Sequence, residues 1–368
     1  EKNKKKFTLV DIPNHMSEED YVENSSQFDI HLLIIGFGSV GEQVLLYAIN
    51  QGVIHSQNKI WIDIVDKNAK EKDDFFMKRF HSSYIQTIQE TEYSPATYII
   101  NGEKCDGELQ IRFYDTDIRG KKFPELLNKM IKVADKKFPF TNVVACFKEM
   151  DNLARCIMEM KKHLRNIDSK IVKMVVCAEF GDTLIEYFDN NQNDKIEIFV
   201  AGSDKDAIRF ENIIDTKEEE KAKRFCYTYN YIYDKIVKKS SACKEYITEN
   251  QTKQNNETIL ENINQVWMEQ SYELKMSNYA LSSHNEIKEQ ILKSICEKKN
   301  NTKNAYIETY FGKDGVILQK KGNQYFYNTE VFIDQLEKYT FIKEMIRMEH
   351  RRWNYFSAVN GWGYIKQS

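Results

Sequence analysis

The chain lacks an excess of one charge, a long apolar run and a signal peptide. Its 53 basic residues are balanced by 56 acidic ones, and the formal charge of −3 argues against a protein held to nucleic acid by a broad positive field. No apolar stretch approaches the roughly eighteen residues of a membrane-spanning helix. We therefore expect a soluble region that does not bind nucleic acid.

Cysteines are few, and their pattern is not that of pairs or metal ligands. The chain has 7 of them, with no C-x-x-C pair and no histidine at zinc-ligand spacing. We expect reduced thiols, a cytoplasmic location and no metal site. Cys146 and Cys177 lie in apolar, strand-like runs, where a cysteine packs as a small hydrophobic residue.

The chain starts with a lysine cluster instead of a methionine. Glu1 is followed by Lys2 and by Lys4 to Lys6, and this start predicts a fragment of a longer protein. Such a cluster is typical of the cytosolic end of a membrane segment, which would make the chain the cytosolic portion of an inner-membrane protein. The alternative is a solvated, disordered tail.

All four prolines lie within the first 139 residues, and β-branched runs are concentrated before residue 202. Six apolar bursts there have the length and composition of strands: His31–Ile35, Ile60–Val65, Gln110–Tyr114, Val143–Phe147, Ile171–Ala178 and Ile196–Val200. Helical patterns separate several of them: Val40–Asn50, Pro124–Ala134 and Asn152–Leu164. The alternation predicts an α/β fold with a doubly wound, mostly parallel, Rossmann-like sheet. We also expect a short helix over Asp73–Arg79 and an extra strand over Thr97–Ile100.

The proline-free remainder predicts a mainly α-helical C-terminal domain. A chain of 368 residues has room for two or three domains. Charged residues are dense after Ser203, and a polar stretch rich in Asn and Gln closes this part. We therefore predict a basic N-terminal tail or membrane-proximal linker over 1–27, the α/β domain over 28–202, a helical connector over 203–258 and the helical domain over 259–368.

A glycine-rich loop lies between the first predicted strand and the following helix. It reads Gly36-Phe37-Gly38-Ser39-Val40-Gly41, which is a G-x-G-x-x-G pattern. In such a loop the first glycine permits the tight turn, the second lets backbone amides approach a pyrophosphate, and the third lets the helix pack on the strand. The phosphate then meets the positive end of the helix.

An acidic residue ends the second predicted strand. Asp66 lies 25 residues after Gly41, close to where this fold places the carboxylate that holds a ribose diol. An acid there favours NAD or an adenine nucleotide over NADP. The alternative is a turn residue, because Asp66-Lys67-Asn68 is also good turn chemistry.

Residues 28–202 resemble the RCK, or TrkA-N, family, the Rossmann domains that regulate potassium conductance. The runs that carry the resemblance are Leu32–Gly41, Ile62–Asp66, Tyr114–Asp117 and Asp151–Leu153. In that family the segment matching Asp115, Thr116 and Asp117 lies beside the adenine, and paired domains move during gating. The resemblance implies NAD or an adenine nucleotide as ligand and a homodimer or higher oligomer. The predicted cofactor-binding residues are Gly36, Phe37, Gly38, Ser39, Val40, Gly41, Asp66, Lys67, Asp115, Thr116 and Asp117.

Two later segments share tryptophan, polar and histidine residues at related spacings. In the first, Trp267 is followed by Ser277-Asn278 and then by His284; the second is Glu349-His350-x-x-Trp353 followed by Gly361-Trp362. This pairing resembles the RyR domain, a module named for its repeats in ryanodine receptors, from about residue 261 to the end of the chain. It implies two helical hairpins and a second small-ligand pocket, lined by Trp267, Asn278, His284, Glu349, His350, Trp353 and Trp362.

Residues on one face of the predicted C-terminal helix give a second argument for this pocket. On a helix Met345, Glu349, Trp353 and Phe356 share one face, which predicts a carboxylate inside an apolar surface, where it needs a donor such as His284, Asn278 or a ligand. The alternative is that Trp267 and Trp353 serve packing alone. Arg351 and Arg352 either neutralise an anionic ligand or form an exposed charged face.

Three classes of function stay open. The first is a cytosolic ligand-sensing region that gates an ion channel or potassium transport. The second is an NAD-dependent oxidoreductase or an NAD-consuming enzyme, and the third is an interaction module without ligand. Because His163 lies among lysines on a predicted helix and no Tyr-x-x-x-Lys occurs at a convincing helical position, we expect no catalytic residues.

Overall fold

The computed structural model describes residues 9, 11–80, 85–88, 97–100, 108–137, 142–164, 172–177, 196–201, 217–232, 263–298, 318–321, 324–327 and 340–362. The chain forms two compact units. The sheet unit comprises Glu1–Asp11, Ser25–Ile213 and Met348–Ser368, and the helical unit comprises Ile12–Asn24 and Ile214–Arg347. This division differs from the predicted domain limits at both ends of the chain.

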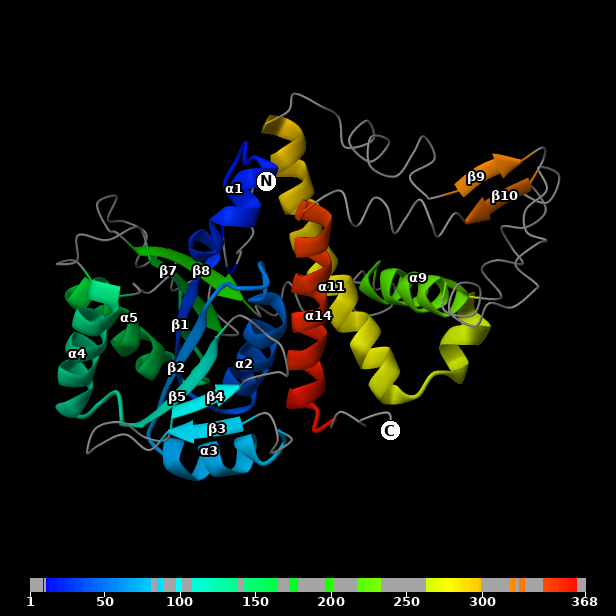
Figure 1. Ribbon diagram of the computed structural model, residues 1–368. Helices are drawn as coiled ribbons and strands as arrows, with labels where there is room; N and C mark the ends of the chain where they lie inside the picture. The colour runs from blue at the N-terminus through cyan, green and yellow to red at the C-terminus, as the bar shows by residue number, and fades with distance from the viewer. Residues whose placement is uncertain are drawn as a thin grey trace, which may run out of the picture. The chain divides into compact units, whose positions relative to one another are not determined.

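An eight-stranded sheet forms the centre of the sheet unit (Figure 1). Its strands are β1 Ile30–Ile35, β2 Ile60–Asp66, β3 Ile85–Ile88, β4 Thr97–Ile100, β5 Leu109–Asp115, β6 Asn142–Ala145, β7 Val172–Cys177 and β8 Ile196–Ala201. The fold is therefore α/β, and all six predicted strands are confirmed. The extra strand over Thr97–Ile100 is confirmed as well, whereas β3 was not predicted because its four residues, Ile-Gln-Thr-Ile, are a short and half-polar run.

The strand order is β3-β4-β5-β2-β1-β6-β7-β8. From β5 to β8 all neighbours are parallel, and β3 and β4 add an antiparallel edge. The six parallel strands follow the order of the doubly wound Rossmann fold, in which the chain changes direction between its first and fourth parallel strands. In this sheet that switch point lies between β1 and β6, where ligands of open α/β sheets bind.

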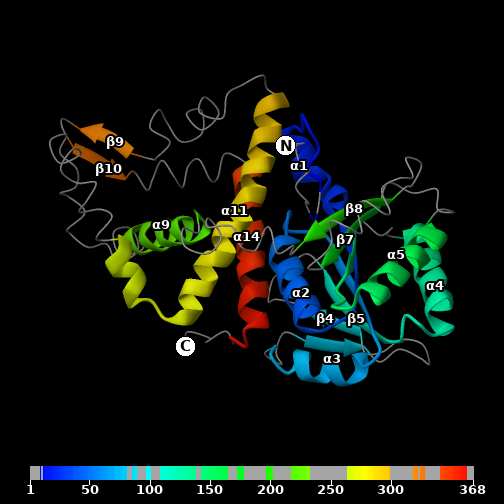
Figure 2. The same cartoon turned by 180° about the vertical axis from the view of Figure 1, so that it is seen from behind.

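Helices cover both faces of the sheet, as Figures 1 and 2 show from opposite sides. They are α2 Ser39–Gln51, α3 Ala69–Met77, α4 Lys122–Lys137 and α5 Met150–Leu164. Side chains of α4 and α5 form one core cluster with Leu33, Val65 and Val143 from the strands. The two middle strands are buried along nearly their whole length, as expected for parallel strands that helices cover on both sides.

The connection Gly52–Lys59 between α2 and β2 is a mostly buried and internally bonded loop. Asn58 is fully buried and organises it. Its amide group donates to the carbonyl oxygens of Phe28 and Gly52, both at 2.9 Å, and its Oδ1 accepts from the backbone N–H of His55 at 3.2 Å. Asn58 therefore gives partners to several backbone polar groups of the loop, which lets the loop lie in the core.

The helical unit contains α1 Glu18–Glu23, α9 Lys217–Ile232, a helix over 263–269, α11 Tyr272–Lys298, the hairpin strands β9 Leu318–Lys321 and β10 Gln324–Tyr327, and the first residues of α14 Thr340–Val359. Part of the predicted N-terminal tail is folded here. Tyr21 is buried with its ring edge-on to Phe341 at 5.4 Å, and the backbone N–H of Met16 donates to the Ser294 hydroxyl at 2.9 Å. The helix α9 agrees with the helical connector predicted for this part.

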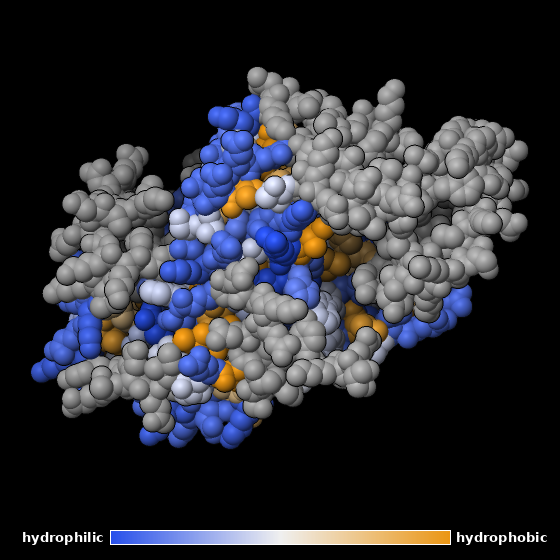
Figure 3. Space-filling view, viewed as in Figure 1, coloured by the Kyte–Doolittle hydropathy of each residue, from blue (hydrophilic) through white to orange (hydrophobic). Residues whose placement is uncertain are grey.

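Among the described residues, no helix is both long and apolar enough to cross a membrane. On the face shown in Figure 3 the described surface is mostly hydrophilic, and the hydrophobic areas on it are small. Isolated exposed hydrophobic side chains of this kind are normal for a folded domain.

Candidate functional site

The glycine loop lies at the carboxyl end of β1, at the switch point of the sheet. Gly36 has a φ of +91°, and a Cβ there would lie 2.5 Å from the carbonyl oxygen of Cys146, so only glycine fits. A Cβ on Gly41 would collide with the carbonyl oxygen of Gly36. The first and third glycines therefore let the strand, the loop and α2 pack closely.

Gly38 has a different environment from the other two glycines. It is the N-cap of α2 and makes no side-chain cap, and no atom of the described residues would lie within 4 Å of a Cβ there. Among the described residues, Gly38, Ser39 and Val40 are exposed at this end of α2, where the backbone N–H groups of the first turn have no partners within the helix. Such an end carries a partial positive charge and suits an anion.

Asp66 is the last residue of β2, and its side chain is hydrogen-bonded to the glycine loop. Its Oδ2 accepts the backbone N–H of Phe37 at 2.7 Å, and its Oδ1 accepts the N–H of Asn68 at 2.9 Å and the Lys72 ammonium at 2.7 Å. Burial raises the pKa of Asp66, but the bonds from Lys72, Phe37 and Asn68 outweigh it and hold the pKa below its usual value. The carboxylate is therefore charged at neutral pH, and it serves both as a turn residue and as a candidate ligand residue.

The predicted adenine segment follows the neighbouring strand. Asp66 pairs in register with Asp115, and the backbone N–H of Thr116 donates to the Asp66 carbonyl oxygen at 2.9 Å. Asp117 accepts hydrogen bonds from both the backbone and the guanidinium of Arg119, which lower its pKa to about 2. Asp115 is exposed at the strand end, whereas Asp117 is already paired.

The structure thus brings the eleven predicted cofactor-binding residues together at the carboxyl ends of the neighbouring strands β1, β2 and β5. The side chains of two of these residues, Phe37 and Lys67, lie in different surroundings from each other. The Phe37 side chain is 4% exposed and packs edge-on against Phe113 at 5.3 Å, so only its backbone faces the loop. Lys67 is exposed after the end of β2. The arrangement can place an anion at the N-terminus of α2 and a diol at Asp66.

Three residues around this site were not predicted from the sequence. Lys72 on α3 donates to Asp66, and Arg79 just after α3 forms an ion pair with Glu42 in the first turn of α2. No spacing rule connects them to the glycine loop, because each pair crosses from one element to another. Only the packing of α3 beside β2 and β5 brings them together.

The predicted second pocket is divided between the two compact units. In the helical unit Trp267 is 5% exposed and packs with Ala222 and Cys226, edge-on to Tyr279 at 5.5 Å. This environment agrees with the packing alternative for that tryptophan. In the same unit the Asn278 side chain donates to the Leu274 carbonyl oxygen, and His284 is fully buried.

The other four pocket residues belong to the sheet unit, on or just after α14. The prediction that Glu349 and Trp353 face a core was wrong: the Trp353 side chain is 40% exposed, and the Glu349 carboxylate is partly exposed. The exposed His350 ring stacks on Trp353 at 6.5 Å, and Trp362 lies edge-on to Phe356 at 5.7 Å. That the seven residues share one cleft stays a prediction.

Arg351 and Arg352 do not form an exposed charged face. Both are buried. Arg352 donates to Glu349 at 2.7 Å, so a donor from the next turn of the same helix reaches the carboxylate for which the sequence predicted His284, Asn278 or a ligand. Arg351 binds the Gly52–Lys59 loop through the His55 carbonyl oxygen, at 3.0 Å. Both guanidinium groups find acceptors in the core, although Arg352 Nη1 has no partner among the described residues, and the apolar-stripe rule does not foresee charged groups at such positions.

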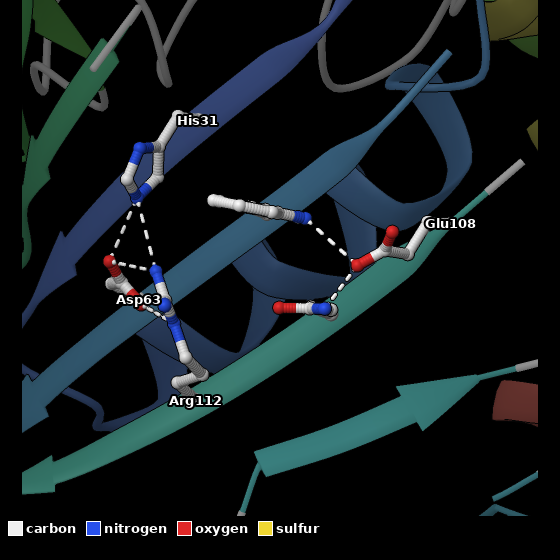
Figure 4. Close-up of polar contacts among 6 residues, drawn as sticks. His31, Asp63, Glu108 and Arg112 are labelled. Atoms are coloured by element: carbon white, nitrogen blue, oxygen red, sulfur yellow. Dashed lines mark hydrogen bonds and ion pairs between the residues drawn. The ribbon is translucent and has the colours of Figure 1, made fainter. Parts of the chain in front are cut away.

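A buried charged network lies on the sheet away from the glycine loop (Figure 4). Asp63 in β2 accepts from the Arg112 guanidinium of β5 at 2.5 and 2.9 Å and lies 2.8 Å from Nε2 of His31 in β1. Asp63 and His31 are almost completely buried. Arg112 also lies over the Trp61 ring, 5.3 Å from its centroid, and the Trp61 indole N–H donates to Glu108. No local pattern predicts this network, because its members come from three separate strands.

A comparison with models of known protein families gave no match, and a comparison with the curated proteins gave none either.

Proposed function

We propose that the sheet unit binds NAD or another adenine nucleotide as a regulatory ligand. The observation that carries the proposal is the open, uncapped N-terminus of α2 at the switch point, next to the Asp66 carboxylate at the end of the neighbouring strand. The phosphates bind at Gly38 and the first turn of α2. The ribose diol binds at Asp66, whose partly exposed Lys72 partner can leave one carboxylate oxygen for a hydroxyl.

The regulatory part of the proposal rests on the resemblance to the RCK family. Ligand binding would favour one arrangement of paired domains and so act on an ion channel or on potassium transport, with the RyR-like part binding a second small ligand.

Assembly as a homodimer or higher oligomer belongs to the same proposal. Sedimentation of the chain at micromolar concentration tests it, and a monomer at all concentrations would contradict it.

We expect Asp66→Asn to weaken nucleotide binding by about 1.5–3 kcal/mol, which is roughly tenfold to a hundredfold, because hydrogen bonds to a charged acceptor are lost. The asparagine keeps one oxygen for the N–H of Phe37 and so preserves the loop better than alanine would. Titration calorimetry with NAD and with ADP gives the affinities. Glu71→Gln, an exposed acid on the same helix as Lys72, is the matched control and should bind as the unaltered protein does. Equal affinities for all three proteins would remove Asp66 from the site.

We expect Gly38→Val to abolish nucleotide binding while leaving the fold intact. The backbone at Gly38 is extended and a Cβ there meets nothing, so the valine is compatible with the structure, but it fills the space where backbone amides approach the phosphates. Calorimetry at millimolar nucleotide should show no binding, and Gly38→Ala should give an intermediate loss. A valine variant with unchanged melting temperature and unchanged affinity would place the phosphates elsewhere.

An NAD-dependent oxidoreductase or an NAD-consuming enzyme is the alternative function. Incubation with NAD separates the two classes. A sensor binds the nucleotide and returns it unchanged, whereas an enzyme of either kind yields reduced or cleaved nucleotide that chromatography detects.

A further inference from the structure

Arg79 lies at the edge of the candidate nucleotide site, in the turn that follows α3. Its Nη1 forms an ion pair with the Glu42 carboxylate. Glu42 belongs to the first turn of α2, and its backbone N–H donates to the carbonyl oxygen of Gly38 at 2.9 Å. The guanidinium therefore contacts a residue that lies one helical turn after the middle glycine of the loop.

The position of Arg79 is set from three further sides. Its guanidinium lies 5.9 Å from the ring centroid of Phe75 and 5.7 Å from that of Phe76. Phe76 in turn packs edge-on against Phe37 of the glycine loop at 5.6 Å. On its backbone side, a Cβ at Gly361 would lie 3.0 Å from the Arg79 carbonyl oxygen. The Gly361-Trp362 motif after α14 thus abuts Arg79 within the sheet unit.

The charge of Arg79 compensates that of the Glu42 carboxylate. A carboxylate in the first turn of α2 stabilises that helix but repels an approaching phosphate. The guanidinium neutralises Glu42 and offers further donors in a planar fork that suits phosphate oxygens. Within the part of the chain that the structure describes, Nη1 is the atom of this fork that has a polar partner, and the Arg79 side chain is 43% exposed.

We propose that Arg79 recognises the phosphates of the nucleotide, with Glu42 holding the guanidinium at the site. The inference rests on the proposed function and adds to it a residue that distinguishes the phosphorylated nucleotide from the nucleoside. Nη1 stays on Glu42, and Nε and Nη2 donate to phosphate oxygens. The same residue joins the glycine loop to the end of α14, whose Gly-Trp motif the nucleotide site does not otherwise use.

The test compares adenosine, ADP and NAD by titration calorimetry on the full chain. We expect Arg79→Gln to weaken ADP and NAD binding about tenfold to a hundredfold, because charge-assisted bonds to phosphate are lost. Adenosine affinity should stay within about twofold, since the sugar and base sites are untouched. Lys78→Gln is the matched control: the neighbouring cation pairs with Asp74 at 2.6 Å, is largely exposed and should change no affinity. Arg79→Lys should recover part of the loss.

The possible outcomes separate the role of Arg79 from the nucleotide site itself. Equal losses for adenosine and ADP, or a fall in the melting temperature of the ligand-free Arg79→Gln variant large enough to explain the loss, would overturn phosphate recognition by this residue. An unchanged ADP affinity would overturn it as well. No binding of ADP or NAD by the unaltered protein would instead overturn the proposed nucleotide site.

Discussion

Replacing Arg351 with methionine is expected to lower the free energy of unfolding of the sheet unit by about 3 kcal/mol or more. Arg351 is 2% exposed and donates to the His55 carbonyl oxygen and to Asn58 Oδ1, both at 3.0 Å. Its guanidinium also reaches the Tyr355 hydroxyl at 3.1 Å. Methionine fills much of the volume but offers no donor, so buried acceptors lose a charged partner.

Urea unfolding followed by circular dichroism measures this loss. His350→Ala, an exposed change on the adjacent position of α14, is the control and should stay within about 0.5 kcal/mol. A double-mutant cycle with Asn58→Ala should give a coupling energy of about 1–3 kcal/mol, because the two side chains share one hydrogen bond. Additive effects of the two substitutions, or a loss no larger than that of the control, would show that α14 is not held at this loop.

The second large effect is expected at Asp63. Asp63→Asn should destabilise the sheet unit by about 3–5 kcal/mol at neutral pH, because it leaves the Arg112 guanidinium in a mostly buried position without its counter-ion. The His31 ring loses its charged partner at the same time. An asparagine keeps the shape of the side chain, so the effect reports charge and hydrogen bonding more than packing.

The destabilisation caused by Asp63→Asn is expected to become smaller as the pH falls. Burial raises the pKa of Asp63, but the His31 contact and the Arg112 guanidinium outweigh burial and hold the pKa below its usual value. A carboxyl group with a lowered folded pKa contributes stability above its unfolded pKa of about 3.9, and this stability is lost as pH falls through the folded value. The gap between the unaltered protein and Asp63→Asn should therefore be largest near neutral pH and narrow below about pH 4.

Urea titrations at several pH values test both statements. Asp74→Asn, an exposed acid paired with Lys78, is the control and should change stability by no more than about 0.5 kcal/mol at any pH. A gap for Asp63→Asn that is below about 1 kcal/mol at neutral pH would mean that the network adds no stability over a neutral substitute. A gap that widens on acidification would contradict a lowered pKa for the Asp63 carboxyl group in the folded protein.

Local patterns predicted most of the sheet. The apolar runs at Ile30–Ile35 and Ile60–Asp66 are long and β-branched enough to identify strands without any neighbour. The glycine pattern between strand and helix placed the turn that only Gly36 and Gly41 can make. The C-terminal part was predicted less well, because the stripe through Glu349 and Trp353 was taken as the buried face of the helix, whereas Trp353 is exposed and Glu349 partly exposed. In α14 the buried positions include Arg351 and Arg352, whose guanidinium groups bind acceptors.

The amino-acid sequence by itself determined the α/β class, the six parallel strands and the glycine loop, since periodicity and backbone sterics act over a few neighbouring residues. Only the tertiary structure decided which charged groups meet: Asp66 with Lys72, Arg79 with Glu42, and Asp63 with Arg112. These pairs join separate elements, and their contacts exist only after β2, α2, α3 and β5 have packed. Electrostatic and hydrogen-bond energies depend on distance and burial in space, and spacing along the chain does not encode either quantity.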